Sequence, residues 1–376
     1  MKPQHLVLPV GVALLLLALL TGVFRLLSNQ GVMAQPPLTT VFPFHGEIMA
    51  FGFLAILLTT ERYLGAAAFK LHPVIHLMPF LVTLGAVLKV VGSLTSVGTV
   101  DTVGSIAVAV GAALYIYLLL EVSRQSAQPL PFRYMALGGV LLMGAAVISL
   151  RESPVQNMGF TLLLLGFPIL TIIGERVELS RFLSPTAYRR AAFGLWAAAA
   201  AYALLLIEGG DYLVAAWAVL MALVALHLVR SELALVKAGE ASSQRLHRYL
   251  GRHLVVAYLW FFVGLGLTIA WSGSERSVAL YDAATHSLAV GFIGTMILAH
   301  APVIVPALLP LRVDQQKISF LPLVLLTAAN LMRVGGHALK GAGLSFGNDV
   351  VGFSGLVVLA TFVAFLWSMA RSLRPA

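Results

Sequence analysis

The chain has 376 residues, of which 60% are hydrophobic and 10% charged, and its mean hydropathy is +0.95. This composition excludes an ordinary soluble domain. The lack of cysteine excludes disulfides, thiolate-ligated haem, cysteine-attached haem and cysteine-ligated iron–sulfur clusters. A net charge of +9 invites a nucleic-acid interpretation, but the placement of the basic residues argues for membrane topology and no nucleic acid.

Apolar segments recur from one end of the chain to the other, each about long enough to cross a bilayer. The twelve are 5–27, 44–60, 73–96, 101–123, 133–150, 157–175, 190–207, 211–230, 252–272, 283–306, 318–338 and 349–371. The sequence therefore predicts an all-α polytopic membrane protein, with a single twelve-helix transmembrane domain over residues 1–376. Lys2 before a Leu-rich core resembles a signal peptide, but the long core and the missing cleavage site favour an uncleaved helix.

Basic residues are distributed unevenly between the two sides of such a bundle. Eighteen lie in the termini and even-numbered connections: Lys2, Arg62, Lys70, Arg124, Arg133, Arg176, Arg181, Arg189, Arg190, Arg230, Lys237, Arg245, Arg248, Arg252, Arg312, Lys317, Arg371 and Arg374. Four lie in the odd-numbered connections, namely Arg25, Arg151, Arg276 and Lys340. The positive-inside rule then predicts that both termini are cytoplasmic.

Ionisable side chains inside a lipid span are costly and usually mark function. The predicted topology places one group of them in the outer leaflet: His45 and Glu47 of 44–60, Asp282 and His286 at the start of 283–306, and Arg333 and His337 of 318–338. Imidazoles at matching depth on two helices are what a buried haem iron or copper requires. We therefore expect His45 and His286 to bind a metal or haem; the alternative is a pair of interfacial histidines near lipid headgroups.

Two cations lie within apolar segments and need partners. Arg333 precedes His337 by four residues, on the same helix face, and would suit haem propionates, Glu47 or Asp282. Lys89, near the middle of 73–96, either snorkels or pairs, and the sequence names no partner for it.

A looser group of histidines is expected in the inner half. His300 follows His286 by fourteen residues, or about 21 Å along one helix face. This spacing resembles that of cytochrome b helices, which carry two stacked haems, but 44–60 has no inner histidine to match, and a buried core histidine is the alternative. His76 and His227 are expected to snorkel. Four others lie in or beside basic interfaces and carry no functional signal: His5, His72, His247 and His253.

A faint repeat relates segments four helices apart. Gly52-Phe53, Gly166-Phe167 and Gly291-Phe292 occupy similar places in 44–60, 157–175 and 283–306. Three quartets of helices would give a pseudo-threefold bundle, as in haem-copper oxidases.

The stretch from His286 to Ala299, His-Ser-Leu-Ala-Val-Gly-Phe-Ile-Gly-Thr-Met-Ile-Leu-Ala, resembles a motif of the NnrS family of haem- and copper-containing membrane proteins, and Met49-Ala-Phe-Gly-Phe53 also fits that family. The resemblance implies twelve spans, haem, copper, a role in nitric oxide metabolism or resistance, and His45 and His286 as ligands. The family tends to show His-x-His-Glu-Met in the second span, where Glu47 here replaces the second histidine, which removes a donor from a copper site.

The chain is more distantly similar to the catalytic subunit of haem-copper oxidases and nitric oxide reductases, where a His-Gly-x-x-Met segment like His45-Gly-Glu-Ile-Met49 opens the second span. That likeness implies His45 and His286 as axial ligands of a low-spin haem. Segments 157–175 and 190–207 contain no histidine, so conventional oxygen reduction is not expected.

The interpretation is therefore a haem protein of the bacterial cytoplasmic (inner) membrane. A b-type haem is expected near the periplasmic side, held by His45 and His286 with Arg333 beside it, and copper is an option. His337, Glu47 and His300 are further candidate metal ligands. A quinol or cytochrome would donate electrons and nitric oxide would be ligand or substrate. No catalytic residue is assigned, and any enzymatic activity would be that of an oxidoreductase. The alternatives are an ion- or proton-coupled transporter that uses the same polar cluster, and a haem-sensing or assembly partner in a respiratory complex.

Overall fold

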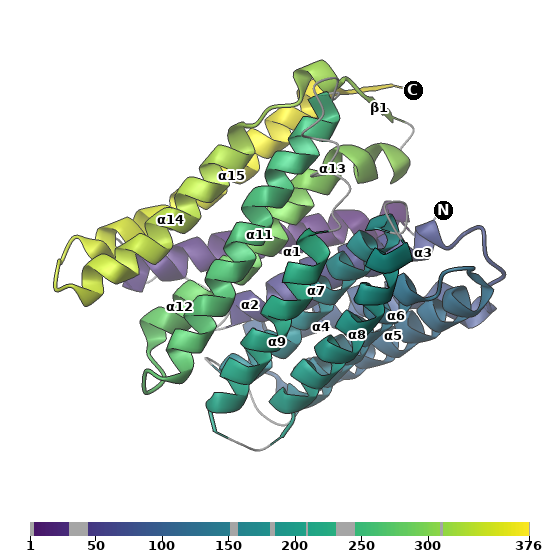
Figure 1. Cartoon of the computed structure of the whole chain (residues 1–376), viewed down its shortest axis with the longest axis horizontal. Coiled ribbons are helices and arrows are strands. Elements are labelled where there is room, and N and C mark those ends of the chain that lie inside the picture. Colours follow the sequence, from purple (N-terminus) through teal and green to yellow (C-terminus); the bar gives the residue numbers. More distant parts are fainter. Residues whose placement is uncertain are drawn as a thin grey trace. The chain divides into compact units, whose positions relative to one another are not determined.

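The computed structural model describes residues 4–29, 44–150, 157–180, 185–207, 210–230, 245–308 and 311–375, and this described part is nearly all helical (Figure 1). The helices are α1 (Gln4–Asn29), α2 (His45–Glu47), η2 (Ile48–Leu54), α3 (Ala55–Gly65), η3 (Pro73–Leu77), α4 (Met78–Thr95), α5 (Gly98–Gln125), α6 (Leu130–Ile148), α7 (Met158–Ser180), α8 (Pro185–Leu205), α9 (Tyr212–Val229), α11 (Arg245–Ser272), α12 (Val278–His286), η4 (Ser287–Gly294), α13 (Thr295–Leu308), η5 (Gln315–Lys317), α14 (Leu321–Gly341) and α15 (Gly347–Ser372). Two short strands, β1 (Leu311–Val313) and β2 (Leu373–Pro375), pair antiparallel.

The helices have the length and composition of a multi-pass membrane protein. Within the described residues, eleven helical stretches are long and apolar enough to span a bilayer, and they match eleven of the twelve predicted segments. The segment 190–207 falls in α8, which is not among the eleven and begins with exposed Arg189 and Arg190. The all-α multi-pass architecture is confirmed, whereas the number twelve and the cytoplasmic termini stay predictions. Four of the basic residues behind that topology lie outside the described residues: Lys2, Arg151, Arg181 and Lys237.

The chain divides into two compact units, Met1–Glu178 (unit 1) and Leu179–Ala376 (unit 2). Each unit is described by itself below. The prediction of a single domain over residues 1–376 stays a prediction.

In unit 1, glycines bring the backbones of α4 and α5 together. A Cβ atom built on Gly85 would lie 2.7 Å from the carbonyl oxygen of Gly104, and one built on Gly104 would lie 2.8 Å from that of Gly85. Small residues permit this close helix approach in membranes. Lys89 lies one turn beyond Gly85, so the hairpin presents it to the first turns of α5.

Glycines also bring the backbones of α14 and α15 together in unit 2. A Cβ on Gly336 would lie 2.9 Å from the carbonyl oxygen of Gly347, and one on Gly347 would lie 2.7 Å from that of Gly336. Arg333 and His337 flank Gly336 on α14, so their backbone positions are set by this glycine contact.

Each unit also contains a helix interrupted by a π-helix that begins within three residues after a predicted ligand histidine. In unit 1, η2 follows the short α2 that begins at His45, and in unit 2, η4 begins directly after His286. π-helical segments inside α-helices are rare and are frequently found at functional sites. The α7 helix continues as an α-helix through Gly166, so its sequence likeness to the other two does not extend to this feature. The pseudo-threefold arrangement stays a prediction.

Candidate functional site

Asp282 of α12 organises the polar cluster of unit 2. Arg333 of α14 donates two hydrogen bonds to its carboxylate, from Nε to Oδ2 at 2.7 Å and from Nη2 to Oδ1 at 2.8 Å. Nε2 of His337 donates to Oδ2 at 2.7 Å. The side chains of these three residues are 24%, 14% and 17% exposed, so the bonds form largely away from water. A bidentate arginine–carboxylate pair fixes both partners geometrically.

His286 is held by the same acidic residue. Its Nδ1 donates to the backbone carbonyl of Asp282 at 2.8 Å and lies 3.3 Å from Oδ1 of the carboxylate. A hydrogen on Nδ1 places the ring lone pair on Nε2, which is the tautomer that metal-binding histidines commonly show. Four of the predicted outer-cluster residues therefore do meet: Asp282, His286, Arg333 and His337.

His337 has the complementary arrangement. Because its Nε2 donates to Asp282, its lone pair is on Nδ1, and this atom is buried with no hydrogen-bond partner among the described residues. The amide of Asn330, one helical turn before Arg333, is likewise buried without a partner for its oxygen or its nitrogen in the described part. A buried polar atom without a partner costs about 1–3 kcal/mol. The donor set is thus of the kind that a bound metal or prosthetic group would satisfy.

His45 and Glu47 belong to unit 1 and have different surroundings. The ring of His45 packs on α1 at Gly22, where an added Cβ would lie 3.1 Å from Nδ1. Oε2 of Glu47 lies 3.2 Å from Nζ of Lys89, so Glu47 is an ion-pair partner of that lysine. His45 and His286 lie in different units, and their joint ligation of one haem stays a prediction.

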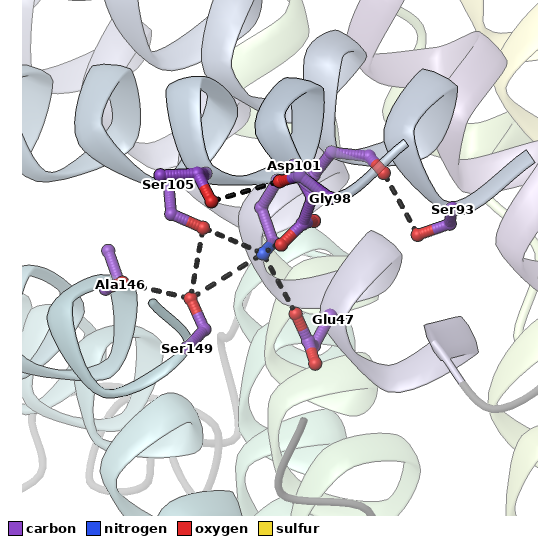
Figure 2. Close-up of polar contacts among 9 residues, drawn as sticks. Glu47, Ser93, Gly98, Asp101, Ser105, Ala146 and Ser149 are labelled. Carbon is purple, nitrogen blue, oxygen red and sulfur yellow. Dashed lines mark hydrogen bonds and ion pairs between the residues drawn. The ribbon is translucent and has the colours of Figure 1, made fainter. Parts of the chain in front are cut away.

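Lys89 has the partners that the sequence could not name. Its Nζ donates to Oδ1 of Asp101 at 3.2 Å, to Oγ of Ser105 at 2.9 Å and to Oγ of Ser149 at 3.5 Å, as Figure 2 shows together with the contact to Glu47. The lysine therefore pairs and does not snorkel. Its side chain is 8% exposed, and Nζ lies 5.4 Å from the centre of the Phe51 ring.

His300 meets a histidine to which the sequence assigned no role. Its Nδ1 donates to the carbonyl of Met296 at 2.6 Å. His253 of α11 is close enough for its charge to interact with that of His300. His253 is fully buried, with Nδ1 bonded to the carbonyl of Tyr249 at 2.8 Å, and its place in or beside a basic interface stays a prediction.

A second charge cluster of unit 1 lies at the C-terminal end of α3. Arg62 bonds Glu61 at 2.8 Å and Glu175 of α7 at 2.6 Å, which ties α3 to α7 within unit 1. His76, expected to snorkel, shares a 2.6 Å hydrogen bond with the hydroxyl of Tyr63.

Sequence reasoning missed Asp101, Ser105 and Ser149 as partners of Lys89. Asp101 alone gave a signal, since it is an acid in the first turn of an apolar segment. Asp282, which the sequence did identify, had a stronger signal, because it lies four residues before His286 and hence on the same helix face. Among the described residues, no group of three or more histidines and acids has the geometry to hold a metal ion by itself.

Comparison with protein families gives one full-length relationship. Residues 5–371 match the family described as Domain of unknown function (DUF8744). No curated protein matches the chain. Because the match covers nearly all of the sequence, this multi-pass membrane protein belongs to the DUF8744 family.

Proposed function

We propose that the protein is an integral-membrane haem protein of the bacterial inner membrane that acts in nitric oxide metabolism or respiratory electron transfer. The observation that carries this proposal is the orientation of two imidazoles by Asp282. His286 offers the lone pair of Nε2 and His337 that of Nδ1, the latter buried without a partner among the described groups. A carboxylate behind the ligand histidine is the usual way to fix an imidazole on a metal.

In this proposal His286 and His337 are the ligand candidates of unit 2, and His45 is that of unit 1. Haem held by these imidazoles would supply electron transfer or the binding of gases such as nitric oxide. Arg333 neutralises Asp282 through Nε and Nη2. Its Nη1 group would donate a hydrogen bond to a haem propionate. The same imidazole donors suit copper.

The absorption spectrum of the purified full-length protein tests the proposal. We expect a Soret band that shifts or weakens in His286→Ala and in His45→Ala and is unchanged in His72→Ala, since His72 is exposed and caps η3. Lack of a Soret band after expression with haem supplementation would refute the haem proposal, and metal analysis would then report on copper. Titration of the reduced protein with nitric oxide distinguishes a gas-binding site, which changes the spectrum, from an electron carrier.

A second candidate function is an ion- or proton-coupled transporter. It is favoured by the π-helical interruptions of two membrane helices, one in each unit, next to ionisable side chains. Transporters commonly bind their ions where membrane helices are broken. Flux into proteoliposomes without a haem spectrum would support this alternative.

A further inference from the structure

One end of unit 2 carries an excess of cations. The strands β1 and β2 pair there, and Nη2 of Arg245 on α11 donates to the carbonyl of Ile318 at 3.0 Å. The backbone nitrogen of Ser319 donates to Oγ of Ser368 on α15 at 3.1 Å. Among the described residues 245–252, 311–320 and 368–374 there is one acid, Asp314, and there are seven cations: Arg245, Arg248, Arg252, Arg312, Lys317, Arg371 and Arg374. Such an excess is typical of the cytoplasmic side of a membrane protein, but the positions of three of these arginines are more specific.

Arg312 and Arg374 lie directly opposite each other in the two-stranded sheet. Directly opposed side chains of an antiparallel pair lie on the same face, with Cβ atoms about 4.5–5.5 Å apart, and like charges there destabilise the pair. Both arginines are exposed, whereas Leu311 and Val313 on either side of Arg312 are half-buried. The sheet therefore holds two positive charges together on its outer face.

A single carboxylate serves this face of the sheet. Oδ2 of Asp314 lies 2.8 Å from Nη2 of Arg374, and Oδ1 of Asp314 accepts a hydrogen bond from the backbone nitrogen of Gln316 at 3.2 Å. Arg312 forms no hydrogen bond or ion pair within the described part of the chain. The guanidinium group of Arg312 is therefore available to an anion from outside the protein.

An exposed apolar stripe on α15 leads to these arginines. Val363, Trp367 and Arg371 follow one another at four-residue spacing on one helix face, and Val363 and Trp367 are 61% and 50% exposed. Cζ of Arg371 lies 4.5 Å from the centre of the Trp367 ring. Tryptophan is enriched where a membrane helix meets the headgroup layer. A phospholipid matches both parts of this surface, whereas a soluble anion matches the arginines alone.

We propose that this surface, formed by Arg312, Arg371 and Arg374 with the α15 stripe, binds an anionic phospholipid. The guanidinium groups donate hydrogen bonds to the headgroup phosphate, for which the planar fork of arginine is well suited. An acyl chain of the same lipid lies along Val363 and Trp367. The site contains none of the ligand candidates of the haem proposal, so the two proposals stand or fall separately.

Native mass spectrometry of the full-length protein in a neutral detergent tests the proposal without a variant. The protein is given equal amounts of phosphatidylglycerol and phosphatidylcholine with the same acyl chains. We expect phosphatidylglycerol to be retained in preference to phosphatidylcholine, and a millimolar excess of sodium phosphate should not displace it. Equal retention of the two lipids would overturn the proposal. Displacement by phosphate would also overturn it, because the site would then take the soluble anion.

Variants locate the bound lipid. Arg312→Gln should weaken the binding of phosphatidylglycerol about fivefold, the effect of one basic residue near an anionic lipid surface, and Arg312→Gln/Arg371→Gln roughly 25-fold. Arg124→Gln is the matched control, because Arg124 is 73% exposed, pairs with Glu121 and belongs to a connection predicted on the same side of the membrane. Its affinity should equal that of the unmutated protein. Equal weakening by Arg124→Gln, or an unchanged affinity in the double variant, would show general attraction in place of this site.

Fluorescence quenching tests the position of the acyl chain. In phosphatidylcholine bilayers that contain a small fraction of phosphatidylglycerol, brominated chains on the phosphatidylglycerol should quench the protein more than the same fraction of brominated phosphatidylcholine. The difference should vanish in Trp367→Phe and in Arg312→Gln/Arg371→Gln. An equal difference in all three proteins would place the lipid elsewhere and overturn the proposal. The absorption spectrum of the double variant should match that of the unmutated protein, whatever the outcome of the haem proposal.

Discussion

Arg333 and Asp282 form a two-point contact between α14 and α12, with hydrogen bonds of 2.7 and 2.8 Å between guanidinium and carboxylate. The contact also holds two histidines in place, since His286 and His337 both bond to Asp282. Asp282 therefore anchors both imidazoles of the proposed site in unit 2, His337 through its carboxylate and His286 through its backbone carbonyl.

Arg333→Ala should destabilise the protein by about 3 kcal/mol, because it leaves the largely buried Asp282 carboxylate without its cation. Unfolding by increasing fractions of sodium dodecyl sulfate in mixed micelles measures the change. Arg276→Ala is the matched control: Arg276 pairs with Asp211 at 3.2 Å but is 74% exposed, so its loss should cost less than about 1 kcal/mol. Equal losses for the two variants would contradict the structural role of Arg333.

The α14–α15 hairpin predicts different outcomes for two adjacent glycines. In Gly336→Ala the new methyl group would lie 2.7 Å from Cγ2 of Val351, and the helices must separate, at a cost of about 1–3 kcal/mol. In Gly335→Ala the methyl group meets nothing within 4 Å, and the better helix propensity of alanine should stabilise by up to about 1 kcal/mol. The same micelle unfolding assay compares them, and a neutral Gly336→Ala would refute the close approach.

Two glycines of the π-helix η4 should respond differently to replacement by alanine. A Cβ on Gly291 would lie 2.6 Å from Cβ of Trp260 on α11, whereas a Cβ on Gly294 has its nearest neighbour at 3.5 Å. Gly291→Ala should therefore lower the midpoint of thermal unfolding by several degrees. It should also alter any spectrum that depends on His286, because η4 begins at Ser287, directly after that histidine. Gly294→Ala should change neither quantity much.

Removal of an acidic partner should offset part of the destabilisation that the loss of Lys89 causes. Lys89→Met alone removes the cation of two acids and should cost about 3 kcal/mol. The double variant Lys89→Met/Asp101→Asn should recover part of this loss, because only Glu47 then lacks its cation. A double-mutant cycle in the micelle assay measures the coupling, and additive effects would show that the pair does not interact.

Local sequence was sufficient for the apolar helices and for the acid–base cluster of unit 2. Hydropathy along the chain identified eleven stretches that are helical in the described residues and are long and apolar enough to span a bilayer. The shared helix face of Arg333 and His337 is a consequence of four-residue spacing, and Asp282 was among the acids expected for Arg333. These inferences succeeded because they depend on burial in lipid and on helix periodicity, both of which are properties of a single segment.

Other features came only from the tertiary structure. The π-helices η2 and η4 are one example. Their Ala-x-Gly-Phe sequences, Ala50–Phe53 and Ala289–Phe292, do not specify whether the backbone forms α-helical or π-helical hydrogen bonds. The burial of His253 was also missed, because its neighbours in sequence are basic while its neighbours in space are Tyr249 and Phe320.

The chain by itself determined that this is an all-α multi-pass membrane protein with histidines and charges at costly places within its spans. Tertiary structure decided which of those groups meet. Lys89 pairs with Asp101 because glycines draw α4 and α5 together, and it also pairs with Glu47 of α2. Asp282 bonds His286 of its own helix, α12, and Arg333 and His337 of α14. Hydropathy is additive along a segment and can be read from it, whereas an ion pair depends on which helices become neighbours.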